Sequence, residues 1–376
     1  INWQQDSLGT MAAFTVKHHL PVAPAAAANR RPDNLNNEKR FAFNIRGVTY
    51  QKGQHWYGNE YAITRQVILN DFKAIRNAGF NTVKVYGPGI YDHVTFQAAR
   101  ETGLSVYYSF WVPGPAVWMA DGRKLNRLAR QIVSTVASMK DNESIQYWNI
   151  GNSTFQEMND VYLQPALFYR TQSSREWLKD LILQIKKVDP SRAVTVDVSV
   201  AHDLRNTVAS LHDQVPEIDA FGLVLKENLE DTAQISKLPA PYYFSSTKPA
   251  LYFKLPDTHT AAIMENWQDQ QTASGVTFNG LKDIWGRNKP DFYEIIRRWT
   301  ADTALHHLPD IKILRPSLTT LPGHVLPYHA LVYQYGKWHL AQYLPTGLRF
   351  EWYEVRTDNW GTPLEIKPLA KGPYLN

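Results

Sequence analysis

The 376-residue sequence contains no cysteine, which excludes disulfide bonds, a thiolate nucleophile and cysteine-ligated zinc or iron–sulfur sites. It also lacks an apolar run of about 18 residues, so we expect no membrane span in it. The sequence also lacks a large net charge, because 40 Lys and Arg against 35 Asp and Glu leave a net charge of +5. So small an excess does not indicate a nucleic-acid partner.

Metal and cofactor motifs are missing too. The pairs His18-His19 and His306-His307 lack the spacing that places two ligands on one helix face, and no Gly-x-Gly-x-x-Gly turn follows the first expected strand. The residues around Ser153 lack the Gly-x-Ser-x-Gly elbow of serine hydrolases. We therefore expect no metal, no organic cofactor and no serine triad.

Aromatic residues are abundant instead, with 12 Trp, 20 Tyr and 15 Phe, and 44% of the residues are hydrophobic. Such a chain is able to bury at least one large core. Aromatic side chains have flat apolar faces and polar edges, so those outside the core are suited to stacking against sugar rings.

From residue 41 onward, short β-rich runs alternate with amphipathic helical stretches. Strand-like Arg46-Gly47-Val48-Thr49-Tyr50 precedes a helix that Thr64 is able to cap and that Gly79 ends. About eight such units, with continuous apolar runs such as 193–198, predict a (β/α)8 TIM barrel, with a doubly wound open sheet as the competing architecture. Strands are expected at 46–50, 81–86, 104–110, 144–150, 193–199, 218–225, 242–244 and 275–278, and helices near 64–79, 92–102, 124–139, 173–188, 202–211, 261–271 and 291–300.

The pattern differs at the two ends of the chain. Residues 1–40 show no sustained period and are interpreted as an N-terminal strap or linker before a barrel over 41–305. Four short runs at 311–314, 329–335, 338–343 and 348–355, separated by turns, predict a small all-β module of Ig-like sandwich type over 309–376, and whether this module is complete is left open.

One segment links the expected barrel to a known family. The fourth expected strand ends Trp148-Asn149-Ile150-Gly151-Asn152-Ser153, which resembles the Trp-x-x-Gly-Asn-Glu signature of clan A glycoside hydrolases, especially family 2-like barrels. The first strand, the stretch over 71–86 and the stretch over 279–290 are similar to other signatures of this family, in the same order. The resemblance covers roughly residues 41–300 and implies carbohydrate chemistry at the C-terminal ends of the strands.

Both catalytic positions depart from the family. Ser153 stands where the resemblance places the acid/base Glu, and Ser246 stands where it places the nucleophile; a second register would put Lys254 there. Retaining glycosidases need two carboxyl groups, and an unactivated serine hydroxyl replaces neither. At the expected eighth strand, Asn279 and Gly280 occupy the place of an aromatic floor.

Other residues are candidates for what remains of a site. Among the carboxylates, Glu157 after the fourth strand and Asp197 at the end of the fifth are substitutes for the missing acids, although solvated or structural roles are the commoner ones for such groups. The candidate sugar-binding residues are Asn152, Lys84, Tyr86, Trp111 and Trp118.

These residues support three hypotheses and leave enzymatic activity uncertain. The first is a catalytically degenerate, glycoside-hydrolase-like pseudoenzyme that binds glycans or acts as a scaffold in a polysaccharide system. The second is an active retaining glycosidase or transglycosidase that uses non-standard carboxylates, and the third is a structural or assembly protein. The expected partner is an oligo- or polysaccharide, self-association or protein partners are left open, and a secreted, periplasmic or cell-surface location is expected.

Overall fold

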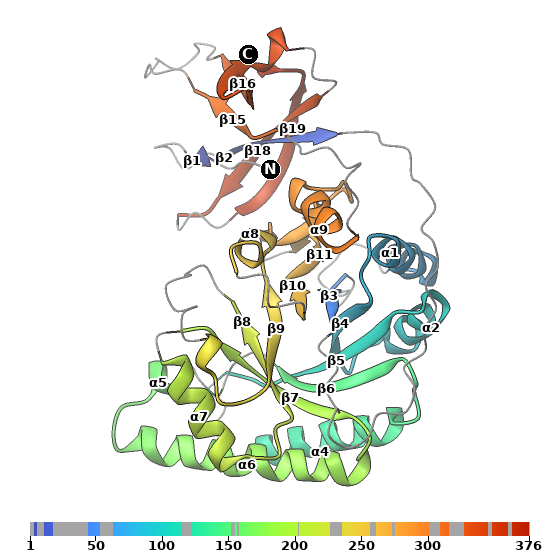
Figure 1. The fold of residues 1–376 in the computed structure, drawn as a ribbon, viewed down its shortest axis with the longest axis vertical. Coiled ribbons are helices and arrows are strands. Elements are labelled where there is room, and N and C mark those ends of the chain that lie inside the picture. Colours follow the sequence, from blue (N-terminus) through green and yellow to red (C-terminus); the bar gives the residue numbers. More distant parts are fainter. Residues whose placement is uncertain are drawn as a thin grey trace. The chain divides into compact units, whose positions relative to one another are not determined.

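A computed structural model gives the three-dimensional structure of the chain (Figure 1). It describes residues 4–5, 11–17, 44–52, 63–114, 122–151, 155, 158–201, 203–225, 235–255, 261–272, 275–300, 309–315, 327–344, 348–359 and 363–375. The chain divides into two compact units. A barrel unit comprises residues 27–54 and 63–266, and a β unit comprises residues 1–26, 55–62 and 267–376.

The barrel unit is built on a closed barrel of eight parallel strands, in the order β10-β3-β4-β5-β6-β7-β8-β9. This confirms the (β/α)8 class and excludes the open sheet. Parallel strands are buried on both faces, which accounts for their apolar character. The barrel strands, first to eighth, are β3 (Arg46–Thr49), β4 (Thr82–Gly87), β5 (Ser105–Trp111), β6 (Ile145–Gly151), β7 (Ala193–Ser199), β8 (Ala220–Val224), β9 (Tyr242–Thr247) and β10 (Ala262–Met264).

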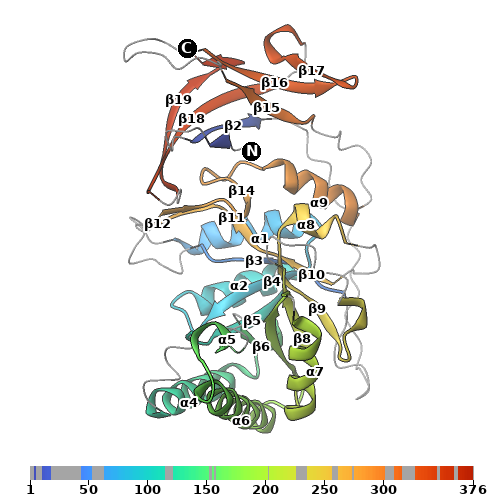
Figure 2. The same ribbon diagram turned by 90° about the vertical axis from the view of Figure 1, so that its left-hand side faces the viewer.

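Helices surround this barrel (Figures 1 and 2). The first one is capped as expected, because the Thr64 side chain accepts a hydrogen bond from the backbone N–H of Val67. None of the described helices is long and apolar enough to cross a membrane. The helices of the barrel unit are α1 (Arg65–Asn77), α2 (Asp92–Thr102), α4 (Gly122–Met139), α5 (Met158–Val161), α6 (Ala166–Val188), α7 (Leu204–Gln214) and α8 (Pro249–Tyr252).

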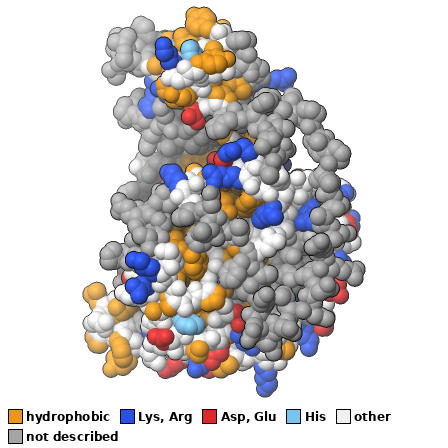
Figure 3. Space-filling model, viewed as in Figure 1, with side chains coloured by type: hydrophobic (Ala, Val, Ile, Leu, Met, Phe, Trp, Pro, Cys, Tyr) orange, Lys and Arg blue, Asp and Glu red, His pale blue; other side chains and the backbone are white. Residues whose placement is uncertain are grey.

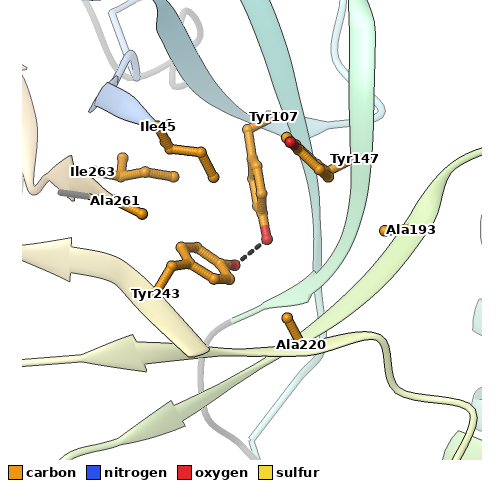
Figure 4. Close-up of a cluster of buried hydrophobic side chains, with 8 residues drawn as sticks. All are labelled: Ile45, Tyr107, Tyr147, Ala193, Ala220, Tyr243, Ala261 and Ile263. Carbon is orange, nitrogen blue, oxygen red and sulfur yellow. Dashed lines mark hydrogen bonds between the residues drawn. The ribbon is translucent and has the colours of Figure 1, made fainter. Parts of the chain in front are cut away.

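A layer of mostly apolar side chains closes part of the barrel interior (Figure 4). Two tyrosines project into it from opposite sides, Tyr107 from β5 and Tyr243 from β9, and their hydroxyl groups are hydrogen-bonded to each other. Small side chains face them, Ala193 from β7 and Ala220 from β8, and leave room for the rings. The interior is therefore packed rather than open, as in other barrels of this class.

The β unit contains two four-stranded antiparallel sheets. One has the order β1-β2-β18-β19, and in the other β16 pairs with β15, β17 and β20. Side chains of both sheets share a buried cluster that includes Val332 and Trp352, which is the core of a sandwich. The strands are β1 (Gln4–Gln5), β2 (Met11–Lys17), β15 (Ile311–Leu314), β16 (Tyr328–Gln334), β17 (Lys337–Leu340), β18 (Arg349–Thr357), β19 (Pro363–Lys371) and β20 (Tyr374–Leu375), with a 3-10 helix η2 (Ala341–Tyr343).

The segment between the eighth barrel strand and this sandwich differs from the expectation. Residues 261–271, expected to be helical, form β10 and then β11 (Asn266–Gln268), and β12 (Gln270–Thr272) follows directly. The expected strand at 275–278 is β13 (Gly275–Thr277), which pairs with β12 outside the barrel. The helix prediction was wrong because the apolar run 261–264 is too short to distinguish a buried strand from a helix by periodicity. The remaining elements are β14 (Gly280–Lys282), which pairs with β11, and α9 (Pro290–Thr300).

The compact units also differ from the expected boundaries. Residues 11–17, inside the expected strap of 1–40, form β2, which pairs with β18 over seven residues. Residues 267–305 group with the β unit rather than with the barrel. The strands β19 and β20 follow the expected last run at 348–355. Long-range strand pairing causes these differences, and a local pattern does not reveal it.

Candidate functional site at the barrel mouth

A buried ion pair lies inside the barrel. Nζ of Lys84, on β4, donates hydrogen bonds to Oδ2 of Asp197 on β7 (2.8 Å) and to Oγ of Ser245 on β9 (2.6 Å). Lys84 is 0% exposed and Asp197 is 1% exposed. The two charges therefore neutralise each other away from water, and both side chains are held in place by neighbouring strands.

Polar side chains continue from this pair across the barrel. Nδ2 of Asn149 donates to Oδ1 of Asp197 (2.9 Å) and to Oγ1 of Thr195 (3.0 Å), and Oδ1 of Asn149 accepts from Ser109. Thr195 is in turn hydrogen-bonded to Tyr107. Five strands thus contribute to one connected network, and both oxygens of Asp197 are engaged in it.

Burial and charge set the protonation states in this network. Burial has the largest single effect and lowers the pKa of Lys84, but Asp197 and Tyr86 together outweigh it, and the pKa lies above its ordinary value. Burial raises the pKa of Tyr86, and it raises those of Tyr107 and Tyr243 far above the ordinary tyrosine value. At neutral pH, Lys84 is therefore charged and the three phenols are neutral.

Glycine makes room for the network on β8. A Cβ added at Gly222 would overlap Oδ1 of Asp197 and would lie 2.6 Å from the Tyr243 hydroxyl and 2.7 Å from Cβ of Ser245. Real Cβ atoms do not approach other atoms so closely, so the position of the Asp197 carboxylate depends on a glycine at 222.

An aromatic pair leads from the network to the surface. Tyr86, at the end of β4, lies with its ring 5.3 Å from Nζ of Lys84. It also contacts Trp111, at the end of β5, where the ring centroids are 5.6 Å apart in an edge-to-face arrangement. Trp111 is 58% exposed. At the C-terminal ends of the second and third barrel strands, a half-buried tyrosine therefore lies beside an exposed tryptophan.

The end of the seventh strand carries serines. Ser246 is half-buried near the C-terminal end of β9, and its carbonyl accepts from the backbone N–H of Leu225 at the end of β8 (2.9 Å). Lys254 follows α8, outside the strand, which excludes the second register considered for this segment. Ser246 is the next-to-last residue of β9, and its correspondence to the family's nucleophile stays a prediction.

The end of the eighth strand corrects the sequence interpretation. Asn279 and Gly280 do not lie there, because the eighth strand is β10 and Gly280 begins β14. The residue that follows β10 is Glu265, which is half-buried, and its backbone N–H donates to the carbonyl of Thr247 at the end of β9 (3.0 Å). Sequence reasoning missed this carboxylate because it placed the eighth strand too far along the chain.

The family-like stretch over 279–290 is a structural bracket in the β unit. Nζ of Lys289 contacts both carboxylate oxygens of Asp269 (2.9 and 3.0 Å), and Asp269 also accepts from the N–H of Gly280 (2.7 Å). Asp283 accepts from the backbone N–H groups of Trp285 and Arg287 and fixes that turn. These charged groups therefore bind backbone N–H groups and one another, which is a structural role.

The remaining candidates lie outside the described residues. They are the positions that the sequence places after the third and fourth strands, namely Trp118, Asn152, Ser153 and Glu157. Within the described residues, no group of three or more His, Asp and Glu side chains is arranged to hold a metal ion. The network residues Ser109, Asn149 and Ser245 were also missed. The pattern that could have revealed them is a pair of polar residues two positions apart in an otherwise apolar strand, such as Tyr107 and Ser109, because such residues lie on the same face of the strand.

Comparison with solved structures identifies the fold. A β-glucuronidase from Bacteroides uniformis matches with a TM-score of 0.56 at 14% identity, over 86% of this chain and 45% of that one. The fold of this chain resembles that of the matched enzyme. A family 2 member from Bacteroides cellulosilyticus (TM-score 0.50, 15% identity, 87% and 46% covered) and a family 2 β-galacturonidase from Eisenbergiella tayi (0.52, 12%, 69% and 51%) also match.

The chain spans about half the length of these glycosidases. No protein-family model and no curated protein sequence matches it. At 12–15% identity the likeness is one of fold, a glycoside-hydrolase-like barrel with β-domains.

Proposed function

We propose that this protein is a glycoside-hydrolase-like barrel that binds a carbohydrate without hydrolysing it. The observation that carries the proposal is Ser246 at the end of the seventh barrel strand. Retention of configuration requires a carboxylate that attacks the anomeric carbon from this side, with a carboxylic acid about 5–5.5 Å away that protonates the leaving oxygen. A serine hydroxyl supplies neither group unless a base activates it.

Asp197, which the sequence offers as a substitute for a missing catalytic carboxylate, is already engaged in the buried network. Asp197 is buried, and its two oxygens accept from Lys84 and Asn149. Moving it to a sugar would leave the Lys84 ammonium buried without its counter-charge, which is costly. The ion pair therefore supports a structural role for Asp197 and for Lys84. Lys84 contributes to the site by positioning the ring of Tyr86.

Sugar recognition is assigned to the aromatic surface. Trp111 presents more than half of its side chain to solvent, and Tyr86 supports its edge. A flat indole face is suited to stacking on the apolar face of a pyranose ring. We propose that Asn152 and Trp118, which follow the fourth and third strands in the sequence, complete the contact. Because polysaccharides are met outside the cytoplasm, a secreted, periplasmic or cell-surface location accompanies this role.

Two measurements test the proposal together. Calorimetric titration with a panel of neutral and uronic-acid oligosaccharides is expected to show binding, and aryl glycosides of the same sugars, glucuronides and galacturonides included, are expected to release no phenol. Trp111→Ala should weaken the binding about five-fold or more. Turnover of any substrate in the panel would refute the claim that the protein does not hydrolyse its ligand. A lack of affinity at millimolar sugar would refute the claim that it binds a carbohydrate.

Glu265 supports a second candidate, an enzyme that uses a non-standard carboxylate. It follows the eighth strand, hydrogen-bonded through its backbone to Thr247, the residue after Ser246. A carboxylate at that place is able to serve as a general base for Ser246 or for water. Glu265→Gln and Ser246→Ala would then each abolish an activity found in the panel, whereas loss in neither variant would exclude this candidate.

A further inference from the structure

An apolar surface lies at one end of the barrel unit, where α5 leads into α6. Figure 3 shows hydrophobic side chains gathered at the lower left, where these helices lie in Figure 1. Four large apolar side chains within nine residues are exposed, and Leu163 is 85% exposed. We name this group the α5–α6 tip; it consists of Val161 (49%), Leu163, Phe168 (64%) and Tyr169 (66%).

A basic helix lies beside this tip. Helix α4 packs against α6, and both views show the two helices side by side (Figures 1 and 2). Its buried residues include Ala129, Ile132 and Val136, on the face toward the barrel. Its sequence contains no Asp or Glu. Its exposed cations form what we call the α4 basic face, which consists of Arg123, Lys124, Arg127 and Arg130.

The tip and the basic face are close enough to act together. The strands β5, β6 and β7 are parallel neighbours, so α4 and α6, which return from β5 and β6, run in the same direction. Trp177 of α6 donates its indole N–H to the carbonyl of Leu125 (3.3 Å), which aligns the two helices at this level. Phe168 lies nine residues before Trp177, or about 13 Å along the axis. Arg123 precedes Leu125 by two residues and so lies nearer the tip. The distance between Arg123 and Phe168 along the helix axes is therefore about 10 Å, which is near one Debye length.

This combination fits one kind of partner. Exposed aromatic and aliphatic side chains beside a cluster of Lys and Arg are typical of surfaces that bind anionic lipids. Arg170 adds a cation at the tip, and Asp160 of α5 is an acidic residue directly before Val161 in the sequence. The first acidic residue of α6, Glu176, lies eight residues beyond Phe168. With the four cations of the α4 basic face included, the charge near the tip is in positive excess, which is complementary to a negative surface.

We propose that the protein docks peripherally on an anionic lipid surface, with the α5–α6 tip inserted among the headgroups and the α4 basic face against lipid phosphates. This role goes beyond carbohydrate binding and does not depend on it. No membrane span is required, because the apolar side chains enter only the headgroup region.

Vesicle flotation of the unmodified chain tests the proposal. The protein should float with vesicles of phosphatidylcholine and phosphatidylglycerol in a ratio of about three to one, and far less with phosphatidylcholine alone. Leu163→Ser/Phe168→Ser should weaken binding at least about ten-fold, since two exposed apolar side chains are lost. Arg123→Gln/Lys124→Gln, at the end of α4 nearest the tip, should weaken it about 25-fold, since each cation near the surface contributes about a five-fold effect.

The control is Leu183→Ser, which changes an exposed leucine of the same helix outside the tip (45% exposed) and should float like the unmodified chain. Circular dichroism melting checks that every variant folds, as expected for exposed positions. Equal flotation with neutral vesicles, or unchanged flotation of the tip variant, would overturn the proposal. So would concentration-dependent dimers without lipid that the tip variant abolishes, because the partner would then be a second copy of the chain.

Discussion

Lys84 and Asp197 are 113 residues apart in the sequence and 2.8 Å apart in the barrel interior, as a salt bridge between two fully buried side chains. The pair joins the second and fifth barrel strands across the interior. Both oxygens of Asp197 are engaged in the buried network, and at the nearby strand ends Tyr86 is half-buried while Trp111 is 58% exposed.

Removing one partner of this pair should destabilise the barrel strongly. Lys84→Met leaves the Asp197 carboxylate buried without a counter-charge, which we expect to cost about 3–5 kcal/mol in the free energy of unfolding. The measurement is urea denaturation followed by far-UV circular dichroism. The double variant Lys84→Met/Asp197→Asn should recover most of the loss, since it leaves no buried charge. Equal destabilisation in both variants would show that the ion pair is not what holds these strands.

High pH should act on the same pair. The pKa of Lys84 lies above its ordinary value of 10.5 in the folded protein because Asp197 and Tyr86 together outweigh the lowering by burial. The folded state therefore holds this proton more tightly than the unfolded state, so the stabilisation is fully present below about pH 10 and is lost as the pH rises through the folded pKa. Denaturation midpoints between neutral pH and pH 11 should fall more steeply for the unmodified chain than for Lys84→Met.

The β unit should show a titration of the same sign, but at acidic pH. Burial raises the pKa of Asp269 to about 6 even though Lys289 beside it lowers the pKa. Between pH 4 and 6 the folded state then binds more protons than the unfolded state, so this residue's contribution falls as the pH rises through that window, by roughly 3 kcal/mol. The difference in unfolding free energy between the unmodified chain and Asp269→Asn isolates this contribution. A difference that is constant from pH 4 to 6 would contradict it.

How far the sequence predicts this structure depends on the range of the interactions involved. The alternation of β-rich and helical segments predicts the barrel, because strand and helix periods are local properties, and Thr64 caps α1 where its side chain predicts. The eighth strand was mislocated because its three residues carry too short an apolar run to define a period. The burial of Lys84 was not predicted either. A lysine in a strand is ordinarily exposed at its tip, and only the closure of the barrel brings Asp197 opposite it.

Gly222 should tolerate no side chain. Its added Cβ would lie 2.6 Å from the Tyr243 hydroxyl and 2.7 Å from Cβ of Ser245, so Gly222→Ala must displace the network that holds Asp197. We expect a loss of about 1–3 kcal/mol, the usual cost of overpacking a core. Gly114→Ala is the matched control, because an added Cβ there meets no atom within 4 Å. Similar melting temperatures for the two variants would contradict this prediction, because they would show that the barrel interior accommodates a Cβ at position 222.

Trp111 should determine carbohydrate affinity without affecting stability. Its side chain is 58% exposed and touches Tyr86 only at the ring edge, so Trp111→Ala removes a stacking surface while the buried network below stays intact. Loss of one stacked ring costs about 1 kcal/mol, and the affinity for the best oligosaccharide of the panel should fall about five-fold or more. Trp285→Ala is the control, because that tryptophan is similarly exposed (45%) but lies in the β unit, stacked on Tyr353. If Trp285→Ala reduces the affinity and Trp111→Ala does not, the sugar binds away from the barrel mouth. Calorimetry of both variants, with melting temperatures to check folding, distinguishes the two outcomes.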